Sequence, residues 1–534
     1  MRNESQERSE EKCVVQCVGR AAQVAAALRF WMSEANNTSW GTTQMVRSPF
    51  LTNGRARGLV WLFAGIVASG CAINPATGKN QLMLVSEDQE IAMGRQADSA
   101  VITSIGLYPD AVWQRYIQQF GARIAATSER PGLPWTFRVV DDPAVNAFAL
   151  PGGFIYVTRG LLAHLTSEAE LASVVGHEIG HVTARHTAAE MSKQELIGLG
   201  LAAGSMANKQ VAKYAGTANQ ALGILYLKFS RDDESQADQL GLRYMRRASY
   251  DPRQMPEVFL MLGRLTAAEG GSQLPTWLET HPSSANRVAA ISAQIAALPQ
   301  DFSGTSVNRD AYERLLDGLV FGSNPRQGFF TGNQFSHPDQ RFRITFPAGW
   351  TTHNGAQAVV AVSSQGDAAI ELSQASEANA DAAARAFLAQ QGITNGSSAR
   401  LSLTSGLPAV SSSFAAATES GALRGTVLFV EYGGAVYRIV GYAPEARWPS
   451  YQGIAEGAER TFQRLTDPAA LNIQPQHMDI VTLVRATTIA QLARERASPA
   501  AATTLALINQ VEVDTPFASG RLVKWVIGLA PPIP

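Results

Sequence analysis

The sequence predicts an α+β protein: a mainly helical domain with a small sheet, followed by a small α+β domain and a short C-terminal module. Between residues 86 and 300, segments with helical spacing surround a few short alternating segments, which favours helices packed on a small sheet. Further along the chain, two apolar segments flank Gly433 and Gly434, a pattern typical of a β-hairpin. Together these patterns indicate a mixed architecture of helices and sheets.

Length, charge and cysteine content limit the possible functions. The 534 residues leave room for several domains, and a hydrophobic fraction of 46% is enough for substantial soluble cores. The 44 basic and 45 acidic residues give a net charge of −1, so no overall basic field favours binding to nucleic acid. Because Cys13, Cys17 and Cys71 are the only cysteines, the bulk of the chain has neither a disulfide framework nor a cysteine zinc site.

Residues 1–70 have the features of a leader, or signal peptide. Three arginines precede an uncharged run, residues 58–70, that is too short to span a bilayer comfortably but suits a signal-peptide core. The run ends in small residues before Cys71 and resembles a bacterial lipobox, with Ala68 in place of the usual leucine. We expect the mature chain to begin at an acylated Cys71, and an uncleaved anchor with a free thiol is the alternative. The residues before Met45 lack this pattern, so Met45 would begin a conventional leader.

The elements after the leader are predicted in order from their local patterns. Residues 74–81 are polar and turn-rich, and we expect a tether there. Ser86 and Gln89 form a capping-box pattern that begins a helix, and helical spacing returns at about residues 109–128. Residues 135–140 alternate as a strand.

A Pro-Gly-Gly break at residues 151–153 indicates a turn, and Phe-Ile-Tyr-Val at residues 154–157 indicates the strand that follows it. The proline beside this strand favours a sheet edge, where an extended peptide could pair by main-chain hydrogen bonds. An ordinary core strand fits the same residues equally well.

His177 and His181, with Glu178 after the first, form an H-E-x-x-H sequence in a helical segment that begins near Ser167. At about 100° per residue, the two histidines lie some 40° apart and can hold one ion from a single helix face. Glu178 projects beside them, where it can hold a water rather than the metal. Because so short a pattern recurs by chance, further ligands decide whether this one binds zinc.

A second acidic pattern supplies candidates for a third ligand. Two histidines leave a catalytic zinc short of the three protein ligands that it usually has. Glu234 can be the third, and Asp238, four residues later on the same face, can orient a ligand histidine through its second ring nitrogen. The ligand role stays open for Asp232, Asp233 and Glu257, and a solvated helix start would also explain this acidic run.

Taken together, these patterns resemble peptidase family M48, in its bacterial periplasmic lipoprotein branch. The resemblance rests on five features in this order: the lipobox, Asn-Ala-Phe-Ala-Leu-Pro-Gly-Gly at residues 146–153, His-Glu-Ile-Gly-His, the Glu-x-x-x-Asp helix, and Thr-His-Pro at residues 280–282 with Arg287. It covers residues 71–300 and implies a zincin metallopeptidase domain of the gluzincin type.

The resemblance implies a zinc metalloendopeptidase that degrades misfolded or stalled proteins of the cell envelope. It implies one Zn²⁺ per chain, with His177, His181 and Glu234 as ligands and Glu178 as general base. Zinc would lower the pKa of a water and polarise the scissile carbonyl, while Glu178 would take the water proton and return it to the leaving amine. His186 is about half a turn out of phase with His177, so we expect it to be structural.

The developing oxyanion needs a donor opposite the zinc, and His281 and Arg287 are the candidates. His281 could donate to the oxyanion, or it could ligate zinc as a fourth ligand and close the site. Of these two roles, we favour donation to the oxyanion, which would stabilise the transition state. A histidine before a proline is also common in turns, so a turn role stays open.

The pattern changes past the first 300 residues. Residues 301–335 are predicted as a linker, and residues 336–468 as a small α+β accessory domain without a catalytic constellation. Residues 474–534 follow the strand, helix, helix, strand order of LysM modules, which bind N-acetylglucosamine polymers such as peptidoglycan. The usual Gly-Asp after the first strand is Ala486-Thr487 here, so a structural remnant without glycan binding is the alternative.

These expectations place the protein in the periplasm, held by a lipid anchor, with the outer membrane favoured because Ala72 rather than aspartate follows Cys71. The expected partners are envelope proteins as substrates, the membrane, and peptidoglycan through the C-terminal module. A catalytically silent chaperone or scaffold that binds outer-membrane proteins or cell wall is the competing class, and a zinc amidase on peptidoglycan is the third. The intact metal set argues against a silent protein.

Overall fold

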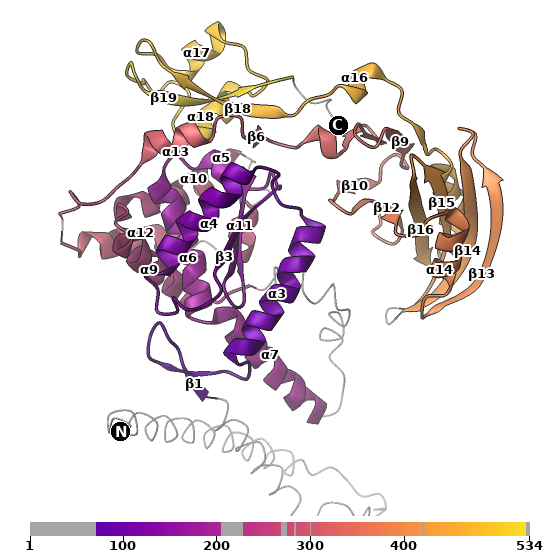
Figure 1. The fold of residues 1–534 in the computed structure, drawn as a ribbon, viewed down its shortest axis with the longest axis horizontal. Coiled ribbons are helices and arrows are strands. Elements are labelled where there is room, and N and C mark those ends of the chain that lie inside the picture. The colour runs from indigo at the N-terminus through magenta and orange to yellow at the C-terminus, as the bar shows by residue number, and fades with distance from the viewer. Residues whose placement is uncertain are drawn as a thin grey trace, which may run out of the picture.

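The computed structural model describes residues 71–203, 228–268, 275–281, 285–299, 301–418 and 421–529. Within these residues helices and strands are mixed, which confirms the predicted α+β class. Figure 1 shows a helical body, a large sheet beside it, and the C-terminal module above it. The predicted leader, with Met45 and the lipobox residues before Cys71, lies outside the described residues. Of the helices described, none is both long and apolar enough to cross a bilayer.

The helical body is built around α6 (Glu168–Thr183), which carries both histidines of the H-E-x-x-H sequence. Ser167 caps its first turn by accepting a hydrogen bond from the Glu170 amide, at the position where the sequence predicts a helix start. All side chains of residues 169–183 are buried, so α6 runs through the core. The other helices of the body are α3 (Glu87–Ser104), α4 (Ala111–Ala125), α5 (Arg159–His164), α7 (His186–Ala203), α9 (Arg231–Arg247), η3 (Pro252–Gln254), α10 (Met255–Ala268), α11 (Thr276–Thr280) and α12 (Ala285–Ala296).

A three-stranded sheet packs on this body. β3 (Thr136–Val140) runs parallel to β5 (Phe154–Thr158), and β4 (Ala147–Leu150) pairs antiparallel with the other side of β5. All five residues of β5 are buried, so it is a central core strand. The edge interpretation of residues 154–157 is therefore wrong: the Pro-Gly-Gly turn folds β4 back along β5, and β4 becomes the edge.

The segment predicted as a tether is a hairpin instead. β1 (Cys71–Ile73) pairs antiparallel with β2 (Asn80–Leu82). Asn74 is only 4% exposed, and its side-chain amide donates to the carbonyl of Ala184, at the end of α6, over 3.1 Å. The side chain of Gln81 donates to the same carbonyl over 3.3 Å. Because these polar groups are partnered inside the fold, residues 74–81 belong to the folded body.

The region predicted as an accessory domain is built on a sheet of seven antiparallel strands, in the order β10-β11-β12-β16-β15-β14-β13. The hairpin predicted at Gly433 and Gly434 joins β15 and β16, two adjacent inner strands of this sheet. A second, four-stranded sheet has the order β17-β9-β8-β7. The elements are β7 (Phe329–Thr331), β8 (Gln334–His337), β9 (Phe342–Thr345), β10 (Thr351–Asn354), β11 (Ala358–Val362), β12 (Ala369–Ala375), α14 (Ala380–Leu388), β13 (Ile393–Ser402), β14 (Pro408–Thr418), β15 (Gly421–Tyr432), β16 (Ala435–Pro444), α15 (Trp448–Glu459), β17 (Gln463–Arg464) and α16 (Pro468–Leu471).

Alternate residues of β15 serve two separate cores, as the two-residue period of a strand requires. Leu428 and Val430 share a core with residues of α15. Val427 and Phe429 share another core with residues of α14. The seven-stranded sheet is therefore covered by a helix on each face.

Residues 301–335, predicted as a linker, contain ordered elements that contact both neighbours. The hydroxyl of Tyr312, in α13 (Arg309–Leu315), donates to the Leu162 carbonyl of the helical body over 2.8 Å. β6 (Val320–Phe321) pairs with the C-terminal module, and η4 (Pro325–Gln327) precedes the strands β7 and β8 of the accessory region. The segment thus holds the parts of the chain together.

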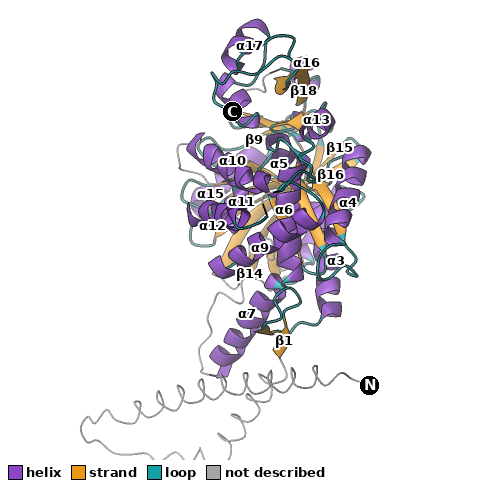
Figure 2. Ribbon diagram, turned by 90° about the vertical axis from the view of Figure 1, so that its left-hand side faces the viewer, coloured by secondary structure: helices purple, strands orange, loops and turns teal. Residues whose placement is uncertain are grey.

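The C-terminal module has the predicted order of strand, helix, helix and strand. Its elements are β18 (Gln476–Thr482), α17 (Ile489–Glu495), α18 (Ala502–Ile508) and β19 (Leu522–Ile527). β18 pairs antiparallel with β19, and the apolar core of the module is continuous with that of the helical body. Fully buried Lys524 donates to the carbonyls of Ala163 and Leu165 over 2.9 and 2.8 Å. Figure 2 shows this module at one end of the molecule, with β1 and α7 toward the other.

Candidate metal centre

Four buried side chains from three segments converge on one point. His177 and His181 come from α6, Glu234 from α9, and His281 from the residue that follows α11. One potential ligand atom of each lies within 4.8 Å of the others. The Nε2 atoms of the two α6 histidines are 3.0 Å apart, and Glu234 Oε1 lies 3.4 Å from His181 Nε2. The side chains that the sequence singles out as ligands therefore meet in space.

Glycine allows α6 and α9 to approach closely enough for this meeting. A Cβ on Gly180, inside the H-E-x-x-H sequence, would lie 3.1 Å from the Ala237 carbonyl oxygen. A Cβ on Gly241 would lie 2.9 Å from the His177 amide nitrogen. Larger residues would separate the helices and move Glu234 away from the histidines.

The start of α9 explains why Glu234, and none of its competitors, reaches the cluster. Ser230 caps the helix, and Asp233 completes the capping box by accepting a hydrogen bond from the Ser230 amide. Asp232 and Glu257 are exposed to solvent. Glu234 follows on the buried face of α9, at 1% exposure.

Each α6 histidine has a partner for its second ring nitrogen. Asp238 Oδ1 lies 3.0 Å from His177 Nδ1. His186 Nδ1 lies 2.9 Å from His181 Nδ1, and His186 Nε2 lies 2.7 Å from the side-chain oxygen of Gln236. These contacts leave both Nε2 atoms facing the cluster, as in metal sites where outer partners orient the ligands. His186 thus lies behind a candidate ligand.

Arg287 binds the carboxylates of the site. Its Nε and Nη2 donate to the two oxygens of Asp238 over 2.8 and 2.7 Å, and its Nη1 lies 3.0 Å from Glu234 Oε2. Burial alone would raise the pKa of Asp238, but hydrogen bonds from His177 and Arg287 outweigh burial and lower it. These contacts place the guanidinium behind the ligand set, so the geometry supports a positioning role rather than contact with an oxyanion.

Glu178 is held by one oxygen only. Trp277 Nε1 donates to Glu178 Oε1 over 3.2 Å, and His281 Nε2 lies 3.6 Å from the same oxygen. Glu178 Oε2 is buried and has no hydrogen-bond partner among the described residues. Since an unpaired buried oxygen is unfavourable, this atom points to a missing donor such as a water.

The donor set fits a divalent metal ion. Burial, and then the neighbouring His177, lower the pKa of His181 well below its usual value, which keeps this imidazole neutral and able to ligate. Burial would raise the pKa of Glu234, but the hydrogen bond with His281 and the nearby charges of His281, His177 and Arg287 together outweigh burial and lower it, so this carboxyl is ionised at neutral pH. Nitrogen and carboxylate donors of this kind suit zinc and related first-row ions.

Two aromatic residues of the site are not predicted from the sequence. Trp277 precedes His281 by one helical turn, and this spacing is the one signal that could have identified it. Phe229 stacks on the His181 ring with centroids 4.2 Å apart and planes at 27°. It stands just before the helix cap at Ser230, where no pattern marks it.

Residues 112–295 match the family model described as peptidase family M48. The chain is also 32% identical over 279 residues to the mitochondrial metalloendopeptidase OMA1 of Schizosaccharomyces pombe, a match that covers 48% of this chain and 79% of that protein. The chain belongs to peptidase family M48. This membership confirms the predicted resemblance to family M48 and the enzyme class, a metalloendopeptidase.

Other relatives of this M48 protein include plant and bacterial proteins. It is 42% identical over 163 residues to the mitochondrial metalloendopeptidase OMA1 of Arabidopsis thaliana, covering 30% of this chain and 32% of that one. It is 33% identical over 218 residues to the beta-barrel assembly-enhancing protease of Yersinia pestis, covering 39% and 44%. The chain thus spans less than half the length of these two relatives. Among solved structures, cyanobacterial PsbP from Synechocystis sp. PCC 6803 matches 26% of the chain at 12% identity and a TM-score of 0.21, too weak a likeness to carry an argument.

Proposed function

We propose that this M48 protein is a zinc-dependent endopeptidase of the bacterial cell envelope that hydrolyses misfolded or stalled envelope proteins. The observation that carries the proposal is the convergence of His177, His181 and Glu234 beside the unpaired oxygen of Glu178. Two imidazoles and a carboxylate are a ligand set that catalytic zinc sites use. The bacterial relatives named beta-barrel assembly-enhancing protease support an envelope substrate.

In this proposal Glu178 moves the protons. The Trp277 indole fixes Glu178 Oε1, whereas the buried Oε2 has no hydrogen-bond partner among the described residues and can accept one from a water. Glu178 can accept a proton from an attacking water there and return it to the leaving amine. When bound, zinc supplies the Lewis acidity that activates the water and polarises the scissile carbonyl.

We assign His281 to the ligand set in the resting enzyme. Its Nδ1 lies 3.4 Å from His177 Nε2 and 3.0 Å from Glu234 Oε1, within the group that can hold one ion. A zinc with four protein ligands has no open position for substrate. This arrangement favours the gating role over the oxyanion role that the sequence puts first, and His281 would have to move before catalysis.

The proposed location is the periplasm, with a lipid on Cys71 that holds the protein at the outer membrane. The lipobox-like sequence supports this location. The relatives do not decide it, because they include both mitochondrial and bacterial proteins. Because β1 begins at Cys71 and the hairpin is fixed to the end of α6, the anchor would hold the catalytic body close to the membrane surface. Contact of the C-terminal module with peptidoglycan also remains a proposal.

The test uses the full chain, purified in detergent, with casein as substrate and zinc measured in parallel. We expect about one zinc per chain, cleavage that stops when zinc is chelated, and recovery when Zn²⁺ is returned. A silent chaperone would suppress aggregation of an unfolded client without cutting casein. A zinc amidase would release muropeptides from peptidoglycan and leave casein intact.

A further inference from the structure

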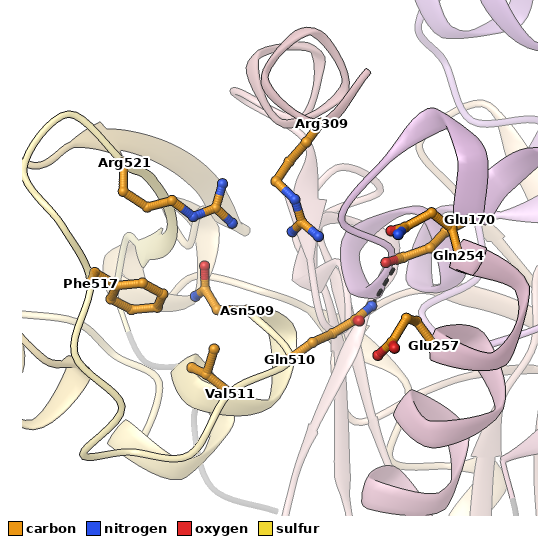
Figure 3. A pocket seen from close by; sticks show the side chains of 9 residues that line it. All are labelled: Glu170, Gln254, Glu257, Arg309, Asn509, Gln510, Val511, Phe517 and Arg521. Carbon is orange, nitrogen blue, oxygen red and sulfur yellow. Dashed lines mark hydrogen bonds between the residues drawn. The ribbon is translucent and has the colours of Figure 1, made fainter. Parts of the chain in front are cut away.

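A polar pocket of about 550 Å³ lies where the C-terminal module meets the helical body (Figure 3). Glu170 of α6, Gln254 of η3 and Glu257 of α10 line one side, and Arg521 and the loop after α18 line the other. None of its lining residues belongs to the metal cluster. Pockets of this volume are large enough for a small ligand.

Positive charge remains available on one wall of the pocket. Arg521 Nη2 lies 3.1 Å and Arg309 Nη1 lies 3.6 Å from the same oxygen of Glu313, which is itself 1% exposed. Two guanidinium groups thus share a single buried carboxylate. No hydrogen bond to the described residues holds Arg309, and Figure 3 shows its guanidinium directed into the pocket.

A carboxylate and an amide oxygen remain available on the other wall. Glu257 is exposed and has no ion pair within the described residues, and Figure 3 shows its carboxylate facing the same space. The side-chain oxygen of Gln254 is buried and accepts no hydrogen bond from the described part of the chain. Glu170 differs, since its oxygens accept from Thr166 over 2.7 Å and from Gln510 over 2.9 Å. The groups without a hydrogen-bond partner among the described residues are therefore the Arg309 guanidinium, the Glu257 carboxylate and the Gln254 side-chain oxygen.

We propose that this junction pocket binds a short peptide in zwitterionic form. The C-terminal carboxylate of the peptide pairs with Arg309 and Arg521, an ammonium group pairs with Glu257, and a peptide N–H donates to Gln254. Charge-assisted hydrogen bonds of this kind are the stronger ones in proteins. Phe517 provides an apolar surface for a side chain of the peptide. A neutral sugar polymer would bring no opposite charge to Arg309 or Glu257.

Such a ligand would lie near the start of the metal helix. Gln510 joins the module to Glu170, about two helical turns before His177. Peptidase products carry new carboxylates, so a product peptide is a natural occupant. This identification of the source rests on the proposed function, whereas binding itself does not.

The test is calorimetric titration of the tripeptide Ala-Ala-Phe into the full chain carrying Glu178→Gln, so that no peptide is cleaved. We expect the free acid to bind more tightly than its C-terminal amide, and Arg309→Gln to weaken the free acid by about tenfold and remove that preference. Glu257→Gln should remove the preference for the free amine over the N-acetyl form. The matched control is Arg314→Gln, an exposed arginine of the same helix, which should bind as the parent does.

Three results would overturn the proposal: no binding of the tripeptide, equal binding of acid and amide, or equal affinity of the Arg309→Gln and Arg314→Gln variants. Arg309 and Glu257 are both accessible to solvent, so we expect these variants to fold with the Tm of the parent. Loss of casein cleavage in the otherwise unaltered chain, with peptide binding retained, would count against the proposed function and leave the pocket assignment standing.

Discussion

Glu234 Oε1 lies 3.0 Å from His281 Nδ1, although the two residues are 47 positions apart in the chain. The contact joins α9 to the segment after α11 at the metal centre. Both side chains are almost fully buried, at 1% and 2% exposure. Because a buried imidazole and a buried carboxylate at this distance can share one ion, His281 belongs to the same site as the H-E-x-x-H helix.

Replacement of His281 tests whether it closes the site. If it is a fourth ligand at rest, His281→Ala should raise casein turnover several-fold and lower zinc affinity, because one coordination position becomes open. Turnover and zinc dissociation are measured on the same preparation. Lower turnover with unchanged zinc affinity would instead support the oxyanion role. Wild-type values for both turnover and zinc affinity would show that His281 is only a turn residue.

Glu234→Ala should lose both zinc and activity, since Glu234 is the only carboxylate in the group of potential ligands found among the described residues. Asp232→Ala is the matched control on the same helix: it removes an exposed carboxylate and should keep both properties. Asp233→Ala should also keep zinc, with a helix start weaker by about 1 kcal/mol because the capping box is lost. Metal analysis by mass spectrometry measures the zinc content of each variant. If zinc is retained in Glu234→Ala but lost in an aspartate variant, that aspartate is the third ligand instead.

Arg287→Gln should weaken zinc binding by about 10–100-fold, as loss of an outer partner of a metal ligand typically does. The reason is that Asp238 would lose its bidentate partner and hold His177 less firmly. Arg246→Gln, an exposed change on α9, is the control for lost positive charge. Unchanged zinc affinity with a large fall in kcat would return Arg287 to the oxyanion role expected from the sequence.

Much of the metal centre is predictable because helical spacing is local. The pair His177 and His181 and the four-residue spacing of Glu234 and Asp238 both follow from the helical period. The helix contact at Gly180 and Gly241 depends on three-dimensional packing, so its importance is not visible in the sequence.

Contacts between distant segments explain most of what the sequence leaves out. Trp277 reaches Glu178 across 99 residues, and no spacing rule connects them. Asn74 lies in the segment predicted as a tether, yet its side-chain amide donates to the buried carbonyl of Ala184, 110 residues away. Lys524 is fully buried and donates to two carbonyls of the helical body, and no local pattern predicts this contact. Contacts between distant segments thus bury polar groups that local sequence does not identify.

The lipid anchor predicts a defined N-terminus. Intact-mass analysis of membrane-extracted protein should show a chain that begins at Cys71 and carries acyl groups, more than one because a single chain binds membranes only weakly. Cys71→Ser should yield an uncleaved or soluble form with casein cleavage retained. An unmodified N-terminus upstream of Cys71 in the wild-type protein would contradict lipidation.

In the proposed mechanism, Glu178 moves protons at a metal site without ligating the metal. The most direct measurement compares zinc content and casein turnover of the wild type and Glu178→Gln in the full chain. We predict the same zinc content in both proteins, with turnover lower by about 10²–10⁴-fold in the glutamine variant because the general base is lost. Wild-type turnover in Glu178→Gln, or loss of zinc together with activity, would contradict this role.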